Sequence, residues 1–215
     1  MIDLIIKTLL AYLIGTVMGG RIVGLLRGGV DLRAQGSGNI GATNALRTQG
    51  VSFALGVLAI DVLKGVIAAA LVPKLPGIDA AVIESDEQAY LCGVAVALGH
   101  CYPVFAGFRG GKGVATLAGV FGALLTASLP WLLASFVVLV MLTGYVSLAT
   151  ISAALVALLF VTCFSPVGVF SPLGAFTVAM VALVCWTHRD NLRRLLGGTE
   201  NRFEKAMVLR KWHRP

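Results

Sequence analysis

The feature that most constrains this chain is an apolar run that extends from Val114 to Phe164. A helix that crosses a bilayer needs about 20 apolar residues, so the run is too long for two comfortable spans. Glycine, proline and polar positions at 128–130 and 144–147 divide it into three shorter helices. A broken backbone is tolerated inside a membrane only where it faces protein or water. The run therefore predicts an integral membrane protein whose helices are interrupted at these two points.

The composition agrees with a membrane protein and excludes several other classes. Of the 215 residues, 58% are hydrophobic and only 13% are charged, which is about half the charged fraction of a soluble domain. These values exclude a disordered chain, a coiled coil and a disulfide scaffold. The four cysteines lie singly in or beside apolar segments, so we expect packing thiols. The scattered acidic and histidine residues predict no metal site, and no cofactor is expected.

Other apolar segments predict further spans at residues 4–26, 51–72, 89–105 and 172–186. Together with the three helices of the central run they give about seven spans. The first segment lacks the basic start and the small-residue cleavage site of a signal peptide, so we expect it to be retained. The expected fold is one all-α transmembrane bundle over residues 1–215, with a basic tail at 188–215 that carries a polar motif.

The formal net charge of +7 is distributed unevenly among the connecting segments. The first loop carries a net charge of +2, the second loop, which includes Asp79, carries −3, the third carries +2 and the tail carries +5. Lysine and arginine accumulate in cytoplasmic loops. We therefore expect an outside N-terminus, with the first loop, the third loop and the tail in the cytoplasm. Arg210–Arg214 is expected to be a solvated basic stretch at the lipid surface.

The first loop contains the string Gly-Ser-Gly-Asn-Ile-Gly-Ala-Thr-Asn at residues 36–44, with Arg47 shortly after it. It matches the G-x-G-x-x-G pattern of dinucleotide sites. That pattern requires a preceding strand and a βαβ unit, which a loop between membrane helices lacks. Glycines let consecutive backbone N–H groups converge, and Ser37, Thr43 and Asn44 add neutral donors. The loop therefore predicts an anion-binding cradle.

The third loop reads Arg-Gly-Gly-Lys-Gly-Val-Ala-Thr at residues 109–116 and opens into an apolar helix. It is not a Walker A loop, because Ala106 and Gly113 stand where glycine and Ser or Thr are required. A glycine-flanked lysine at a helix N-terminus combines a mobile charge with free N–H groups and the positive end of the helix dipole. We therefore predict that Lys112 binds phosphate. The alternative is a flexible interfacial loop whose Arg and Lys side chains snorkel, so that their charged ends lie in water.

A third polar cluster begins where the last span ends, at His188. The His-Arg-Asp string at 188–190 is not a kinase motif, because so short a chain holds no nucleotide lobe. If the helix continues, His188 and Asn191 share one face and point together into the cytoplasmic mouth. An interfacial histidine can equally be a packing residue, and spacing alone leaves both interpretations open.

The three clusters lie on one side of the membrane, so we expect them to meet where the bundle ends and to form one polyanion-binding mouth. Within the second span, Asp61 and Lys64 stand three residues apart, where each charge costs about 2.5–3.5 kcal/mol. We expect an inward-facing ion pair that either holds helices together or orients the loops. Glycines at 15 and 19, and at 20 and 24, predict close helix packing.

Together the three motifs resemble those of the bacterial acyl-phosphate-dependent glycerol-3-phosphate acyltransferases, the PlsY family. The shared strings are residues 36–44, His100 through Pro103 to Thr116, and the cluster from His188 to Glu200 that includes Asn191 and Gly198. They occur in order along the whole chain. Arg109 stands where the family has lysine more often, a change that keeps the charge.

The resemblance implies a seven-span enzyme of the bacterial inner membrane, with its N-terminus outside and its active site facing the cytoplasm. It implies transfer of a fatty acyl group from acyl phosphate to the sn-1 hydroxyl of glycerol 3-phosphate, giving lysophosphatidic acid and phosphate. This is the first step of bacterial phospholipid synthesis. The implied partners are these two substrates and the lipid bilayer, without nucleic acid, and a monomer is expected. Other glycerolipid acyltransferases use an H-x-x-x-x-D dyad, which His100 and His188 do not form, because Phe105 and Arg193 follow them.

The expected chemistry rests on gripping two phosphate dianions side by side, for which Lys, Arg and backbone donors are suited. Acyl phosphate is an activated mixed anhydride, so positioning and charge stabilisation can suffice without an acyl-enzyme. The hydroxyl proton passes either to a substrate phosphate oxygen or to His188. The catalytic candidates are Ser37, Arg47, Lys112, His188 and Asn191. The substrate-binding candidates are Gly36, Gly38, Asn39, Thr43, Asn44, Gly110, Gly111, Gly113, Thr116, Ser147, Arg194 and Glu200.

Each substrate has an expected set of contacts. The acyl-phosphate headgroup is assigned to Ser37, Gly38, Thr43 and Arg47, with Ser147 completing the pocket. Lys112 and the backbone of residues 110–113 are expected to bind the phosphate of glycerol 3-phosphate. His188 and Asn191 would orient the glycerol hydroxyls, and Glu200 would secure the basic cluster or its loop.

Two other functions fit a basic mouth on a small helical bundle. One is a transporter for organic phosphate, although no internal repeat is visible in the sequence. The other is a lipid enzyme that acts on a phosphorylated polyprenol. Phosphate release that requires both acyl phosphate and glycerol 3-phosphate would separate the acyltransferase from both alternatives.

Overall fold

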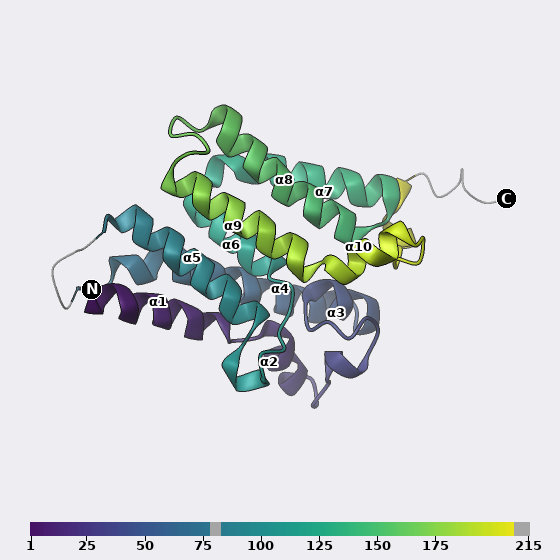
Figure 1. Cartoon of the computed structure of the whole chain (residues 1–215). Coiled ribbons are helices and arrows are strands. Elements are labelled where there is room, and N and C mark those ends of the chain that lie inside the picture. The colour runs from purple at the N-terminus through teal and green to yellow at the C-terminus, as the bar shows by residue number, and fades with distance from the viewer. Residues whose placement is uncertain (78–82, 209–215) are drawn as a thin grey trace. The chain divides into compact units, whose positions relative to one another are not determined.

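The computed structural model describes residues 1–77 and 83–208, without the side chain of Lys205. Asp79 and the basic stretch Arg210–Arg214 lie outside the described residues. Within the described residues every regular element is helical (Figure 1), which confirms the all-α prediction. The chain divides into two compact units, one from Met1 to Thr126 and the other from Ala127 onward.

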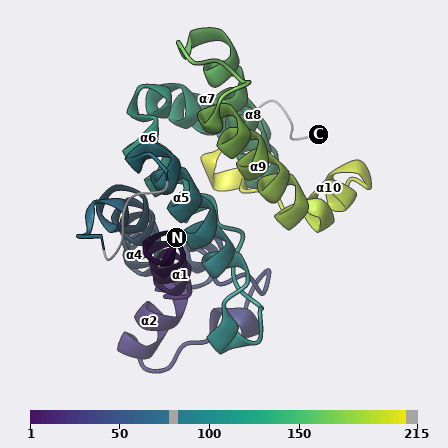
Figure 2. The ribbon, with the colours of Figure 1, turned by 60° about the vertical axis from the view of Figure 1, so that its left-hand side comes forward.

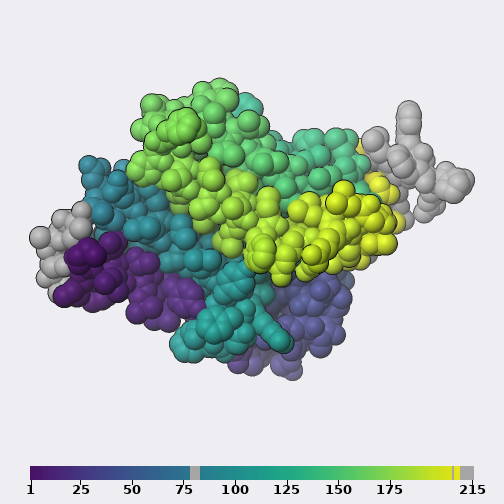
Figure 3. Space-filling view, in the orientation of Figure 1, coloured from purple at the N-terminus to yellow at the C-terminus, as the bar shows by residue number. Residues whose placement is uncertain are grey.

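The first unit is built around two pairs of packed helices. In one pair α1 lies along α5 (Figures 1 and 3), and in the other α4 packs against α6. Beyond its α-helical part, α4 continues through a π-helical turn at Ile67–Leu71 and a 3₁₀ turn at Val72–Lys74. The helices of this unit are α1 (Ile2–Gly15), α2 (Gly19–Leu26), α3 (Ala42–Thr48), α4 (Val51–Val66), α5 (Ser85–Cys101) and α6 (Val114–Leu124).

The predicted first span is broken in the structure. Residues 4–26 were expected to form one helix, but α1 and α2 meet at an angle of 44° across a break of three residues. The break leaves backbone carbonyl and N–H groups without helical partners. The side chains of Asp61 and Lys64 in α4 form hydrogen bonds with these groups instead. A local hydropathy window does not include these distant residues of α4, so it predicts one continuous helix here.

Glycine allows α1 to approach α5 closely. A methyl group at Gly15 would overlap the carbonyl oxygen of Val96, and one at Gly99 would overlap that of Tyr12. The predicted close packing is therefore confirmed at position 15, and Gly19 likewise lies against α4. The glycines at 20 and 24 instead approach the loop carbonyls of residues 40 and 30, so their close neighbours are loop backbone rather than another helix.

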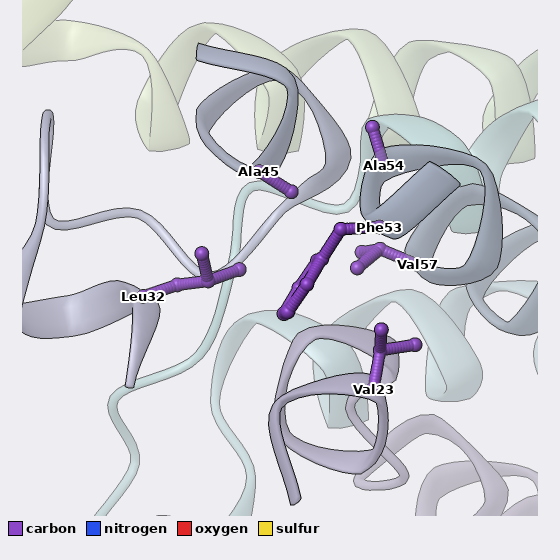
Figure 4. Packing of buried hydrophobic residues seen from close by; sticks show 6 residues of the cluster. All are labelled: Val23, Leu32, Ala45, Phe53, Ala54 and Val57. Atoms are coloured by element: carbon purple, nitrogen blue, oxygen red, sulfur yellow. The ribbon is translucent and has the colours of Figure 1, made fainter. Parts of the chain in front are cut away.

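A small apolar cluster anchors the polar first loop to the helices. Leu32 from the loop and Ala45 from α3 pack against Phe53 and Val57 of α4, with Val23 of α2 on the other side (Figure 4). Leu32, Ala45, Phe53 and Val57 are all at most 2% exposed. Leu32 and Ala45 stand on either side of residues 36–44, so their packing in this cluster anchors both ends of that segment.

The second unit is a set of neighbouring helices in which α8 packs against both α7 and α9 (Figure 2). The predicted interruptions of the central run are confirmed, since α7 begins with proline at its second residue and ends at Gly144, which has φ of +74°. A last 3₁₀ turn covers Glu204–Ala206. The helices are α7 (Leu129–Thr143), α8 (Val146–Phe164), α9 (Pro172–Thr187) and α10 (Arg189–Leu196).

Among the described residues, four helical stretches are long and apolar enough to cross a membrane, and the bent α1–α2 pair makes a fifth candidate. The four are Val51–Lys74, Ser85–Ala106, Thr126–Thr143 and Val146–Phe164. The sequence predicted about seven spans, which is two more than these five candidates. Two shorter apolar helices, Val114–Leu124 and Pro172–Thr187, account for the difference.

Candidate active site

Asn44 organises the first polar loop from its centre. Its side-chain amide donates to the carbonyl oxygens of Leu32, Gln35 and Asn39 at 3.1, 2.9 and 2.8 Å. Its side-chain oxygen accepts the backbone N–H of Ser37 at 2.9 Å. Asn44 is only 2% exposed. The geometry therefore assigns Asn44 to the support of the loop instead of the substrate contact predicted from sequence.

Three backbone N–H groups of this loop donate to partners inside the protein. Ser37 donates to Asn44, Gly38 donates to the carbonyl of Gln35, and Gly41 donates to the side chain of Asn39. Gly36 and Gly38 have φ of +56° and +71°, so their conformation is one that favours glycine. The predicted cradle of converging N–H groups is thus not formed by these three amides. Ser37 on this loop, and Thr43 and Arg47 on the following helix α3, have exposed polar side chains.

The second motif is held against the end of α5 by its own backbone. Gly110 donates to the carbonyl of Cys101 and Gly111 donates to that of His100, at 3.0 and 3.1 Å. A methyl group at Gly110 would overlap the carbonyl oxygen of His100, and one at Gly111 would overlap the Nε2 atom of its ring. Two amides predicted to bind phosphate are therefore already bonded. The glycines are needed because the loop passes so close to α5.

Lys112 lies just before the first turn of α6. Gly113 caps this helix with φ of +81°, and its carbonyl accepts the N–H of Leu117 at 2.8 Å. The lysine is partly exposed beside the start of α6, where the helix dipole favours an anion. Thr116 belongs to the same turn but is 0% exposed, and its hydroxyl lies 3.2 Å from Nδ1 of His100. Its predicted contact with substrate is therefore not supported.

Arg33 connects the two motif loops of the first unit. Its Nη2 donates to the backbone carbonyl of Arg109 at 2.9 Å, across 76 residues of sequence. Sequence reasoning counted Arg33 only as a charge. Its position three residues before the first glycine of the motif was the available signal. The contact brings the loop at 36–44 and the loop at 109–113 together.

The inward-facing ion pair predicted within the second span is confirmed. Lys64 Nζ lies 2.9 Å from Asp61 Oδ1, and the two side chains are 4% and 2% exposed. His100 Nδ1 lies 2.7 Å from Lys64 Nζ. Three polar side chains from α4 and α5 thus form a buried cluster below the Lys112 loop.

Glu200 organises the polar cluster of the second unit. Its Oε1 accepts from Ser147 at 2.9 Å and from Asn191 at 2.6 Å, while its Oε2 accepts from Arg194 Nε at 2.8 Å. Burial acts to raise the pKa of the Glu200 carboxyl, but the hydrogen bonds from Asn191, Ser147 and Arg194 outweigh it and hold the pKa below its ordinary value. The predicted role of Glu200 in securing the basic cluster agrees with these contacts. Ser147 is 5% exposed and directed at the same carboxylate.

His188 stands at a break between two helices. The last span was expected to end at residue 186, and α9 ends at Thr187, while α10 begins at Arg189 as a separate helix. His188 Nδ1 lies 2.9 Å from the carbonyl oxygen of Val184. A carbonyl only accepts, so this contact assigns the proton to Nδ1 and makes Nε2 an acceptor in the neutral ring. Ring orientation is thus set by the last turn of α9.

Comparison with known proteins agrees with the motif geometry. A family model described as glycerol-3-phosphate acyltransferase matches residues 5–198. The chain belongs to the glycerol-3-phosphate acyltransferase family. The glycerol-3-phosphate acyltransferase of Geobacter sulfurreducens is 40% identical over 95% of this chain and 100% of its own length, and that of Aquifex aeolicus is 41% identical over 90% and 95%.

Solved structures of glycerol-3-phosphate acyltransferases share the fold. A crystal structure of PlsY, an integral membrane glycerol 3-phosphate acyltransferase, in its glycerol 3-phosphate form matches with a TM-score of 0.81 and 38% identity, over 93% of this chain and 95% of that one. The lysophosphatidic acid form matches with a TM-score of 0.80 and 37% identity. The predicted family, the acyltransferase activity and the multi-pass membrane location are confirmed.

The structure sorts the candidate residues of this acyltransferase into two groups. The first unit carries Ser37 on its first loop, Thr43 and Arg47 on α3, and Lys112 before α6, and Arg33 joins the two motif loops. The second unit brings together Ser147, Asn191 and Arg194 around Glu200. Over residues 1–77 and 83–208, no three His, Cys, Asp or Glu side chains are arranged to hold a metal ion.

Proposed function

We propose that the enzyme transfers a fatty acyl group from acyl phosphate to the sn-1 hydroxyl of glycerol 3-phosphate, releasing inorganic phosphate. The observation that carries this proposal is the hydrogen bond from Arg33 to Arg109, which joins two glycine-rich basic loops within one unit. Two phosphate dianions repel each other, so a site that holds both needs two sets of cationic and hydroxyl groups. The two loops supply such sets.

The reaction needs no covalent enzyme intermediate. The sn-1 hydroxyl oxygen attacks the acyl carbonyl carbon, the bond from that carbon to the phosphate oxygen breaks, and phosphate leaves with the bonding electron pair. The hydroxyl proton passes to a substrate phosphate oxygen. Charge grows on the leaving phosphate, where Arg and Lys side chains stabilise it. The chain has no H-x-x-x-x-D dyad at His100 or His188, which favours this donor over a thioester.

The first unit is assigned the two phosphates. Ser37 on the first loop, and Thr43 and Arg47 on α3, are exposed, and we assign them the acyl-phosphate headgroup, next to Gly36, Gly38 and Asn39. Lys112 and Gly113, at the start of α6, are assigned the phosphate of glycerol 3-phosphate. The helix dipole adds to the charge of the lysine there.

The hydroxyl groups of the acceptor, glycerol 3-phosphate, are assigned to residues of the second unit. His188 and Asn191 are proposed to orient the glycerol hydroxyls, with the Nε2 acceptor of His188 as the atom that binds a hydroxyl proton. Asn191 is held by Glu200, which also holds Ser147 and Arg194. The supporting observation is that each of these side chains has a fixed partner, so its orientation is set before substrate arrives.

The membrane topology proposed for the enzyme has seven spans, with an outside N-terminus and both basic loops in the cytoplasm. It counts the four long helices, the bent α1–α2 pair and the two short apolar helices α6 and α9. The net charges of +2, −3 and +2 on the first three loops and of +5 on the tail support this orientation. The proposed location is therefore the bacterial inner membrane, with the monomer as the unit of function.

The decisive experiment uses purified full-length protein in detergent with palmitoyl phosphate and glycerol 3-phosphate. We expect phosphate release that requires both substrates, and we expect no lysophosphatidic acid to form when palmitoyl-CoA replaces palmitoyl phosphate. Release of phosphate without glycerol 3-phosphate, or none from folded protein, would contradict the proposal. Ser37→Ala and Lys112→Ala are expected to lower kcat/KM by about 100-fold or more. Unchanged rates in both variants would overturn the residue assignments while leaving the reaction intact.

His188 is the protein-borne alternative for the proton. In the substrate-assisted reaction, His188→Gln keeps a side chain able to bind a hydroxyl, so we expect partial activity with a weakened affinity for glycerol 3-phosphate. A His188→Gln variant that binds glycerol 3-phosphate normally and turns over at no pH would instead identify His188 as the base.

A further inference from the structure

The break between α1 and α2 is stabilised by side chains of α4. Lys64 Nζ donates to the carbonyl oxygens of Gly15, the last residue of α1, and of Val17 in the break, at 3.1 and 2.6 Å. Asp61 Oδ1 accepts the backbone N–H of Gly19, the first residue of α2, at 3.1 Å. One ion pair thus satisfies backbone groups on both sides of the break. Unsatisfied groups would be costly in this apolar setting.

His100 joins this ion pair to the second motif. An ammonium group has only donors, and Lys64 Nζ lies 2.7 Å from Nδ1 of His100, so Nδ1 accepts and the proton is assigned to Nε2. The Nε2 edge of the ring faces Gly111, where a methyl group would overlap it. The carbonyl of His100 also accepts the N–H of Gly111. The ring is 2% exposed, so its orientation is fixed by these neighbours.

The loop that carries Lys112 therefore rests on a surface whose shape depends on Lys64. The lysine sets which ring nitrogen of His100 accepts, and the ring sets how closely Gly111 approaches α5. Thr116 completes the contact from the α6 side, since its hydroxyl lies 3.2 Å from the same Nδ1. The chain of contacts runs from α4 through α5 to the residue next to Lys112.

We infer that Asp61, Lys64 and His100 are positioning residues that hold the Lys112 loop in the geometry that binds the phosphate of glycerol 3-phosphate. This inference rests on the proposed function of that loop. A positioning role differs from a purely structural role of the ion pair, because it predicts a specific effect on the binding of one substrate. Loss of the pair shifts the loop and weakens glycerol 3-phosphate binding more than it slows acyl transfer from bound substrates.

A second buried ion pair in the same unit offers a matched control. Lys7 is 6% exposed, pairs with Asp3 at 2.9 Å and donates to the carbonyl of Pro73 at 3.1 Å. It lies on α1 eight residues before Gly15, which is about 12 Å along the helix. Lys7→Gln removes the same charge from the same kind of pair, away from the Lys112 loop.

The experiment compares steady-state kinetics and thermal unfolding of Lys64→Gln and Lys7→Gln in full-length protein in detergent. We expect both variants to lower the unfolding temperature. Only Lys64→Gln is expected to raise the KM for glycerol 3-phosphate, about tenfold, with kcat and the KM for palmitoyl phosphate changed less than about threefold. Equal KM values in the two variants, whether raised or normal, would overturn the inference.

Variants at His100 keep the test decisive if Lys64→Gln does not fold. His100→Asn places an amide oxygen near the Nδ1 position, so it retains an acceptor for Lys64 and removes the ring edge that faces Gly111. We expect a near-normal unfolding temperature together with a raised KM for glycerol 3-phosphate. A normal KM in folded His100→Asn would contradict the inference.

A double-mutant cycle tests the contact between the ring and the loop. In Gly111→Ala the new methyl overlaps the His100 ring, whereas in the His100→Asn background that ring is absent. We therefore expect the KM effects of the two substitutions to be strongly less than multiplicative. Multiplicative effects would show that the ring does not position the loop.

Failure of the inference is distinguishable from failure of the proposed function. If Lys112→Ala raises the KM for glycerol 3-phosphate while Lys64→Gln and His100→Asn leave it unchanged, only the positioning inference is overturned. If Lys112→Ala leaves that KM unchanged, the assignment of the loop is wrong and the inference is overturned with it.

Discussion

Asn44 Oδ1 accepts the backbone N–H of Ser37 at 2.9 Å, seven residues earlier in the chain. The same side chain donates to three carbonyl oxygens of the loop. The amide of Asn44 therefore determines the path of the loop that carries Ser37. Both an acceptor and a donor are needed at this position, and among side chains of this size only asparagine supplies them.

Asn44→Asp is expected to destabilise the protein, because it replaces the donor with an oxygen that faces three carbonyl oxygens. We expect a loss of about 2–4 kcal/mol in the free energy of unfolding and a large loss of activity. Asn39→Asp is the matched comparison, since Asn39 Oδ1 only needs to accept the N–H of Gly41. Thermal unfolding in detergent checks both variants, and equal destabilisation would contradict the organising role of Asn44.

The hydrogen bond from Arg33 to Arg109 leads to a second prediction. Arg33→Ala should lower kcat/KM about tenfold, because one charge-assisted hydrogen bond between the motif loops is lost. Arg27→Ala removes the same charge from the same loop, where the Arg27 side chain donates to Ser52 Oγ at 3.4 Å. We expect it to change kcat/KM less than about twofold. Steady-state kinetics at constant ionic strength compares the two, and equal losses would show that only net charge matters.

Local patterns in the sequence were sufficient for the interruptions of the central run and for the motifs. Pro130 and Gly144 act through their own backbone preferences, so the interruptions of the central run were predictable. The pairing of Asp61 with Lys64 was predictable as well, because both lie one turn apart on an apolar helix. The family was predictable from three short sequence motifs, which require no knowledge of the three-dimensional contacts.

Long-range contacts explain what the sequence did not reveal. The break between α1 and α2 depends on Asp61 and Lys64, which are more than forty residues away from it. Several amides of the predicted N–H cradles already have partners, because the Asn44 side chain accepts the N–H of Ser37 and the His100 carbonyl accepts that of Gly111. A glycine-rich string indicates that the backbone turns sharply, but it does not say which groups its amides bond.

The carboxylate of Glu200 leads to a prediction on pH. Its pKa is lowered in the folded protein, so its contribution to stability is present above its ordinary pKa, about 4.5, and is lost as pH falls through the lower folded value. Glu200→Gln should therefore be less stable than the parent at pH 7, and this difference should narrow below about pH 4. Thermal unfolding in detergent across this range measures it. Glu204→Gln, an exposed change in the same tail, should show no such difference at pH 7.

The close approach of α1 to α5 leads to a prediction on packing. Gly99→Ala introduces a methyl group that would overlap the backbone carbonyl of Tyr12, and neither helix backbone can yield without disturbing the other contacts along the pair. We expect a loss of about 1–3 kcal/mol in the free energy of unfolding. Gly197→Ala is the control, because its methyl would have ordinary contacts of 3.4 Å or more and its φ is −83°. Thermal unfolding in detergent should therefore show a lower midpoint for Gly99→Ala alone, and an unchanged midpoint would mean that the two helices separate enough to admit a methyl group.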